Sequence, residues 1–310
     1  MNQYYVKRIV SAILTILLIA TVTFFMMKAI PGGPFSRERA LPAEIIAALN
    51  NKYKLNDPLF KQYVDYMLGL FTFDLGPSFR RLGYTVNELI AIGFPVSAKI
   101  GFLAIMTIVL IGIPLGVISA LRQSKLTDYV VMVLATLGVT IPSFVLATLY
   151  IYFFAGKWKL VPAFGLESGL AYIGPVLALS GYSISFVARL TRSSMLEVLR
   201  QDYVRTAKAS GLSEFQVVFK YALKNALIPV ITYMGPMIAA ILTGSFVVER
   251  IFALPGMGYM YVEGVNNRDY TVIMGTTVFY AIFYVVMVLL VDIGYTLADP
   301  RIRLGKKYGE

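Results

Sequence analysis

Cysteine and histidine are both absent from this 310-residue chain, and these two absences exclude most enzyme chemistry. Without cysteine there is no disulfide framework, no thiol nucleophile and no thiolate metal site. Without histidine the chain lacks the commonest general base and the commonest metal ligand. It also contains no GxxxxGK[ST] run, the pattern that forms a phosphate-binding loop. We therefore expect a protein without catalytic residues and without a metal or cofactor of its own.

Charged residues are scarce as well, at 15% of the chain, whereas hydrophobic residues make up 58%. Soluble proteins contain about 25% charged and about 45–50% apolar residues. A membrane-spanning helix needs about 20 apolar residues, and six segments meet this requirement. We therefore predict an all-α membrane protein with six transmembrane helices. Their approximate bounds are Ile9–Ile30, Val96–Leu121, Tyr129–Ala155, Ala171–Leu190, Ala226–Val248 and Val272–Ala298.

The net charge of +11 is distributed unevenly over the loops between these spans. The loop 189–224 has seven basic and three acidic residues, whereas 249–271 has two basic and three acidic residues. Lys and Arg concentrate in the cytoplasmic loops of membrane proteins. We therefore expect both termini and the loop 189–224 to be cytoplasmic. Topology accounts for the charge, so the expected surroundings are membrane lipid and no nucleic acid.

Three parts of the chain are expected from this pattern. Residues 1–30 form the first transmembrane helix, 31–94 form an external, mainly helical subdomain, and 95–310 form a five-helix core. The external subdomain either covers the bundle or docks an external partner, and the sequence leaves both readings open.

Ionisable residues within the spans are few, and each lies near a span end. Lys28, Lys99 and Asp292 can reach the membrane interface from there, which favours a structural role. Hydroxyl groups inside the spans either line a polar path or belong to small residues that let helices pack closely. The candidate path residues are Ser143, Ser180, Ser183 and Tyr233.

The polar stretch 202–223, DYVRTAKASGLSEFQVVFKYAL, interrupts the membrane spans. Asp202 is a good helix N-cap, and Gly211 suits the position that ends a helix. Ser213 and Gln216 have the spacing of a capping box. Apolar residues then recur at helical spacing, at Phe215, Val218, Phe219 and Ala222. We predict two short helices joined by a glycine bend, either lying on the membrane surface or docking a cytoplasmic protein.

The surrounding segment 189–230, RLTRSSMLEVLRQDYVRTAKASGLSEFQVVFKYALKNALIPV, resembles the cytoplasmic loop of bacterial ABC importer permeases. Arg205-Thr206-Ala207 stands in place of the family's Glu-Ala-Ala, and Gly211 stands at its glycine. Tyr221-Ala222-Leu223-Lys224 replaces Ile-x-Leu-Pro, so the motif's Glu and Pro are missing. The peptide branch of the family has a similar sequence in this loop, with the same departures from the motif. Other stretches that resemble it include GSFVVERIFALPGMGYMYVEGVNNRDYTVIMG and VDIGYTLADPRIR.

This resemblance implies the type I ABC importer permease fold and a specific role. The chain would be the first, B-type transmembrane subunit of a dipeptide or oligopeptide importer in the bacterial cytoplasmic membrane. Its partners would be a homologous second permease, an external binding protein, and two ATPase subunits that hold ATP and Mg. The coupling region would be at about 189–224, and its expected ATPase contacts are Arg205, Thr206, Ala207, Gly211, Leu212 and Ser213.

Other functions remain open at this stage. An ion-coupled secondary carrier would transport solute without ATP, although such a carrier is expected to place a charge near the membrane midplane. A membrane anchor would have no transport role. Within the ABC family, a nickel chelate or a sugar would be alternative ligands.

Overall fold

The computed structural model describes residues 2–31, 33–35 and 43–298, with side chains for 6–31, 33–35 and 44–290. Within these ranges the chain is helical and has no β-strand; Pro77 and Thr85 form an isolated bridge. The prediction of an all-α fold is confirmed. Asp292, expected near the end of the last span, lies outside the described side chains.

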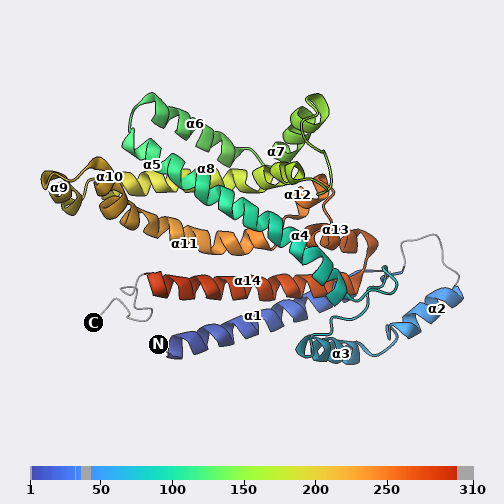
Figure 1. Ribbon diagram of the computed structural model, residues 1–310. Helices are drawn as coiled ribbons and strands as arrows, with labels where there is room; N and C mark the ends of the chain where they lie inside the picture. The colour runs from blue at the N-terminus through green and yellow to red at the C-terminus, as the bar shows by residue number, and fades with distance from the viewer. Residues whose placement is uncertain (1, 32, 36–42, 299–310) are drawn as a thin grey trace. The chain divides into compact units, whose positions relative to one another are not determined.

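The chain packs as two compact units, Met1–Val96 with Pro255–Glu310, and Ser97–Leu254. Figure 1 labels their helices, and α4 (Val86–Thr107) contributes residues to both. The first unit contains α1 (Asn2–Ala29), α2 (Ala43–Lys52), α3 (Leu59–Phe71), α13 (Met257–Asn267) and α14 (Tyr270–Ala298). The second contains α5 (Ile113–Leu121), α6 (Leu126–Thr140), α7 (Ser143–Tyr150), α8 (Ile173–Val198), α9 (Asp202–Ala209), α10 (Glu214–Gln216), α11 (Leu223–Leu242) and α12 (Phe246–Ile251). These units group the chain by packing, so the expected parts 1–30, 31–94 and 95–310 stay predictions.

Among the described residues, five helical stretches are long and apolar enough to cross a membrane. They are Val6–Ala29, Val86–Leu121, Gly169–Val198, Glu214–Ile251 and Tyr270–Leu290. Val86–Leu121 and Glu214–Ile251 begin well before the expected starts at Val96 and Ala226. These five stretches correspond to the first, second, fourth, fifth and sixth expected spans.

The third expected span, Tyr129–Ala155, is found as a broken span and not as one continuous helix. Two helical stretches, Leu126–Thr140 and Ser143–Lys157, meet there at a bend of 103°, and together they count as one broken span. Pro142 causes this break because it lacks an N–H and disfavours helical backbone in the residue before it. Ile141 accordingly has extended backbone, with φ −80° and ψ 120°.

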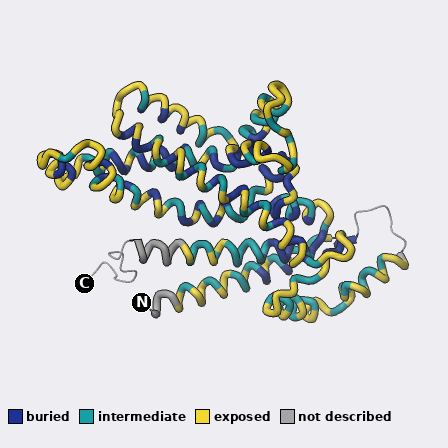
Figure 2. The backbone as a smooth tube through the Cα atoms, viewed as in Figure 1, coloured by how far each residue is buried: buried dark blue, intermediate teal, exposed yellow. Residues whose placement is uncertain are grey.

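The helix α8 is the centre of the second unit, and Figure 2 shows buried residues along it. Glycines on neighbouring helices let it approach closely. A Cβ on Gly138 of α6 would lie 2.0 Å from Ser185 Oγ, and one on Gly116 of α5 would lie 2.5 Å from the Ala188 carbonyl oxygen. Small residues therefore allow close helix packing here, as is common between membrane helices.

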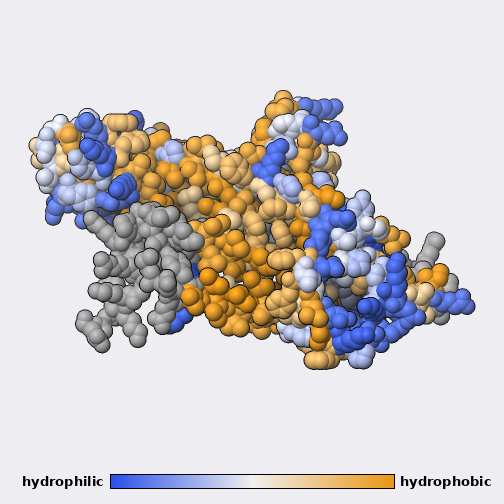
Figure 3. All heavy atoms as spheres, turned by 60° about the horizontal axis from the view of Figure 1, so that its bottom comes forward, coloured by the Kyte–Doolittle hydropathy of each residue, from blue (hydrophilic) through white to orange (hydrophobic). Residues whose placement is uncertain are grey.

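In the first unit α1 packs against α14, and the helical insertion α2–α3 follows α1. Aromatic rings join the insertion to α1: the ring of Phe24 lies 5.4 Å from that of Tyr63 and 5.5 Å from that of Tyr66. Along α1 large apolar side chains are exposed, including Leu14 at 61% and Leu18 at 63%. Figure 3 shows hydrophobic surface over α1 and hydrophilic residues over α2 and α3. This distribution suits a helix in lipid that leads to an insertion in water.

Asp269 connects two distant segments of the first unit. It caps α14, accepting hydrogen bonds from Thr271 Oγ1 at 3.0 Å and from Val272 N at 3.4 Å. It also accepts from Phe79 N at 3.1 Å, Arg80 N at 3.2 Å and the Ser78 hydroxyl. Because Asp269 is only 2% exposed, buried donors such as Phe79 N depend on it for a hydrogen bond.

We expect Asp269→Ala to destabilise the contact between the loop 78–80 and the start of α14, because each buried donor left unpaired costs about 1–3 kcal/mol. The predicted loss is about 2–4 kcal/mol, measured as the change in the free energy of unfolding in detergent. Asp74→Ala is the matched control, since Asp74 is exposed and accepts one hydrogen bond, from Gly76 N. Equal losses for the two variants would contradict the role given to Asp269.

Candidate functional site

The elbow segment, residues 202–222, contains the two short helices that the sequence predicts. The first is α9, whose N-cap is Gln201 with extended backbone at φ −69° and ψ 147°. The prediction of Asp202 as N-cap is therefore wrong by one residue, since Asp202 is the first helical residue. From that position its negative carboxylate interacts favourably with the positive end of the helix dipole. Its ion pair with Arg205, at 3.5 Å, adds little because both side chains are exposed.

Gly211 ends α9 in the left-handed conformation, as predicted. Its φ is +77°, and its N–H donates to the Lys208 carbonyl oxygen at 3.1 Å. Ser210 N, the preceding donor, bonds to the Thr206 carbonyl oxygen at 3.0 Å. A Cβ built on Gly211 meets nothing within 4 Å. Backbone strain alone therefore opposes a side chain at this position.

The predicted capping box after the bend is confirmed. Gln216 N donates to Ser213 Oγ at 3.3 Å, and Ser213 N donates to Gln216 Oε1 at 3.2 Å. These reciprocal bonds satisfy donors at the start of α10, which continues as a π-helical turn over Val217–Ala222 into α11. The first half of the elbow segment therefore ends at Gly211, and the second half begins at Ser213.

The buried face of the second half contains only part of the apolar series 215, 218, 219 and 222. Val217, Val218 and Ala222 are buried, whereas Phe215 is 69% exposed and Phe219 is 52% exposed. The two phenylalanine rings contact each other, with centroids 4.4 Å apart. Only Val218 and Ala222 of this apolar series therefore face the core.

A small apolar core attaches α9 to its neighbours. Val204, Ala207 and Val217 form its buried part, and partly buried side chains from the end of α8 pack against it. A polar contact adds to it: Asn225 Nδ2 donates to Tyr203 Oη at 2.7 Å. The sequence analysis missed this pair, because the two residues lie 22 positions apart and only the fold brings them together. The elbow segment is therefore fixed to both α8 and α11.

Four of the six expected contact residues are available at the surface. Arg205, Thr206, Gly211 and Ser213 are exposed. Ala207 is only 6% exposed and belongs to the small core, and Leu212 is partly buried against it. Figure 3 shows hydrophilic residues gathered over this end of the second unit. The contact role of the six residues stays a prediction.

The expected path residues lie on three helices of the second unit. Ser180 is fully buried on α8, and its hydroxyl has no hydrogen-bond partner among the described residues. Ser183 is buried on the same helix. Tyr233 of α11 is partly buried and stacks on Phe186 of α8, with centroids 4.2 Å apart. Ser143 is the first residue of α7, directly after the bend. Their path role stays a prediction.

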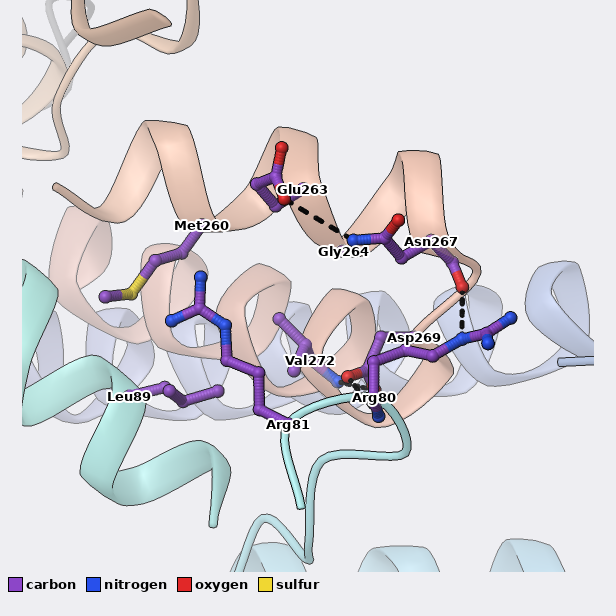
Figure 4. A pocket seen from close by; sticks show the side chains of 9 residues that line it. All are labelled: Arg80, Arg81, Leu89, Met260, Glu263, Gly264, Asn267, Asp269 and Val272. Atoms are coloured by element: carbon purple, nitrogen blue, oxygen red, sulfur yellow. Dashed lines mark hydrogen bonds between the residues drawn. The ribbon is translucent and has the colours of Figure 1, made fainter. Parts of the chain in front are cut away.

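A second concave site lies in the first unit, beside Asp269 (Figure 4). Arg80 spans one side, donating from Nε to the Asn267 carbonyl oxygen at 2.7 Å and from Nη2 to the Pro34 carbonyl oxygen at 2.8 Å. Across the pocket, Asn267 Nδ2 donates to Glu263 Oε2 at 3.4 Å. Most of these polar groups bond to one another, which favours a structural role for this pocket.

Comparison with known proteins gives the family of the chain. A family model described as a binding-protein-dependent transport system inner membrane component matches residues 112–304. A second model, for the N-terminal part of such membrane components, matches residues 1–87. The chain belongs to this family. The resemblance to ABC importer permeases is therefore confirmed, and with it the type I permease fold.

Individual relatives of this permease match over their whole length. A dipeptide transport system permease protein DppB from Bacillus subtilis is 51% identical over 99% of this chain and 100% of the relative. An oligopeptide transport system permease protein OppB from Salmonella typhimurium is 45% identical over 98% and 100%. The DppB protein of Lactococcus lactis is 40% identical over the same shares. The permease is thus a multi-pass membrane component and not itself an enzyme.

We expect Gly211→Ala to open α9 locally, because the left-handed conformation costs a residue with a Cβ about 1 kcal/mol or more. Hydrogen exchange of the α9 amides should accelerate by about fivefold. Gly211→Asn should change it less, since Asn tolerates this conformation. Gly169→Ala is the control, because Gly169 has open space around it but no positive φ. No difference between positions 211 and 169 would contradict the strain argument.

Proposed function

We propose that this permease is the transmembrane subunit of an ATP-driven importer that moves peptides across the bacterial cytoplasmic membrane. The observation that carries the proposal is identity of 40–51% with dipeptide and oligopeptide permeases over their full length. Identity at this level covers the bundle, the insertion and the elbow segment together. The nickel-chelate and sugar ligands have no comparable support among these relatives.

The proposed complex contains a second, homologous permease that completes the translocation path, and an external binding protein that delivers the peptide. Two cytoplasmic ATPase subunits bind ATP and Mg, since this chain has no phosphate-binding loop. The clustering of basic residues between 189 and 224 supports a cytoplasmic position for the elbow segment and for both termini. The insertion after α1 would then be external.

The elbow segment is suited to transmit force from the ATPase subunits. Its two halves are short, and Gly211 and the Ser213–Gln216 capping box define the bend between them. The small core and the Tyr203–Asn225 contact fix it to α8 and α11. We propose that Arg205, Thr206, Gly211 and Ser213 contact the ATPase directly, whereas Ala207 and Leu212 support the bend from below.

Within the second unit, Ser143, Ser180, Ser183 and Tyr233 are the proposed path residues. These four side chains carry hydroxyl groups and no charge. Lys99, near the start of this unit, is exposed and donates to Tyr172 Oη at 3.0 Å. Hydroxyls suit a peptide that passes without binding tightly. The relatives named above are all peptide transport system permeases, which makes ion coupling the weaker alternative.

Reconstitution of the whole complex into liposomes tests the function. Peptide transport should require ATP on the side of the membrane where the ATPase subunits lie. It should continue when ion gradients are collapsed. Peptide with its binding protein should also stimulate ATP hydrolysis. Uptake that persists without ATP hydrolysis but stops with the ion gradient would establish the carrier alternative. Absence of any substrate-dependent ATPase stimulation would favour an anchor.

We expect Gly211→Val to insert into the membrane normally but to weaken ATPase docking, because the strained bend displaces the exposed contact residues. Co-purification of the ATPase subunits should fall by about tenfold or more, as the loss of one well-placed contact group predicts. Gly169→Val is the matched control. If the Gly211→Val complex assembles and transports normally, the assignment of the elbow segment is wrong.

A further inference from the structure

A buried carboxylate joins three helices of the second unit. Asp128, in the first turn of α6, is 3% exposed. Arg192 of α8 donates from Nε to Oδ1 at 2.6 Å and from Nη2 to Oδ2 at 2.8 Å. Ser119 of α5 donates from Oγ to Oδ1 at 2.5 Å. We call Asp128, Arg192 and Ser119 the clamp, because each comes from a different helix.

The same carboxylate also holds the turn between α5 and α6. Ser124 N donates to Asp128 Oδ2 at 2.9 Å, so the carboxylate accepts four hydrogen bonds. Ser124 has a φ of +61°, a left-handed conformation that is unfavourable for a residue with a Cβ. The bond to Asp128 compensates for this strain. The hairpin α5–α6 is therefore fixed to α8 at its turn as well as along its helices.

The clamp lies close to the elbow segment along the chain and in the packing. Arg192 precedes the end of α8 at Val198 by six residues, about 9 Å of helix. Between them, the fully buried Met195 packs with Val117 and Ala120 of the α5 side and with Val218 and Ala222 of the elbow segment. Continuous side-chain packing thus runs from the elbow segment to the hairpin.

We propose that the clamp locks the elbow segment and the α5–α6 hairpin into one body, so that the ATPase moves α5, α6 and α8 together. This inference rests on the proposed function. Apolar contacts let packed helices slide by small shear movements. A bidentate arginine–carboxylate pair resists sliding and rotation, because its planar geometry is directional. Asp128 and Arg192 are in this sense positioning residues that touch neither peptide nor nucleotide.

The reconstituted complex allows a direct test through the number of peptides imported per ATP hydrolysed. Asp128→Asn and Arg192→Gln should lower this ratio by about tenfold, a typical coupling free energy, while the ATPase subunits still co-purify. Arg192→Lys keeps the charge but loses the bidentate geometry, so its ratio should fall between those of Arg192→Gln and the unaltered protein. Arg189→Gln is the matched control: Arg189 lies one turn earlier on α8 and donates to the Ala135 carbonyl oxygen, at 3.1 Å, with no carboxylate involved.

A distance measurement separates locking from simple folding. The chain has no cysteine, so cysteines placed at the exposed Gln123 and Lys208 can be spin-labelled without background from this chain. The distance between the two labels should stay narrowly distributed with and without ATP in the unaltered protein and in Arg189→Gln. It should broaden in Asp128→Asn and, to a smaller extent, in Arg192→Lys.

The outcomes distinguish this inference from the proposed function. If the unaltered complex shows no ATP-driven peptide uptake, the proposed function is wrong and the inference fails with it. If the unaltered complex transports but Arg192→Lys and Asp128→Asn keep its ratio and its narrow distance, the inference alone is wrong. If Asp128→Asn fails to assemble while Arg192→Lys transports with an unchanged ratio, the clamp is only a folding contact and the inference is again wrong.

Discussion

Close packing around α8 is the constraint on which the second unit depends. Where Gly116 and Gly138 face α8, a side chain has no room, so the neighbouring helices approach to backbone contact. Such proximity brings side chains from separate helices within hydrogen-bonding distance, as at Asp128 and Arg192. Membrane helices gain little from apolar burial against each other, so shape and directional bonds determine their arrangement. Close packing thus makes α8 the element that connects bundle and elbow segment.

The elbow segment and the bundle differ in the way they are stabilised, and the difference suits their proposed roles. Local signals form the elbow segment: a left-handed glycine, a capping box and a core of three small apolar residues. Bonds between distant residues hold the bundle, including Asp128 with Arg192 here and Asp269 with the 78–80 loop in the first unit. A locally defined, exposed segment on a tightly connected bundle can pass a displacement onward without losing its own shape.

The sequence predicts the local features well, because their causes lie within a few residues. Spans follow from apolar runs, and Gly211 and the Ser213–Gln216 capping box follow from backbone and side-chain chemistry. The sequence shows Pro142 inside the third span, but membrane helices often tolerate proline, so the residue alone does not show whether the helix breaks. Contacts such as Asp128–Arg192, 64 residues apart, leave no periodic signal in a single sequence. The π-helical turn Val217–Ala222 likewise has no signal in the simple helical period.

Site-specific cross-linking in the assembled complex tests the central claim most directly, namely that the elbow segment docks the ATPase. A single cysteine at the exposed Thr206, in this cysteine-free chain, would carry a short thiol-reactive cross-linker. A cysteine at Lys157, exposed at the end of the bent third span, serves as the comparison. The account predicts that Thr206→Cys cross-links to an ATPase subunit and Lys157→Cys does not. An ATPase cross-link from Lys157→Cys, with none from Thr206→Cys, would contradict it.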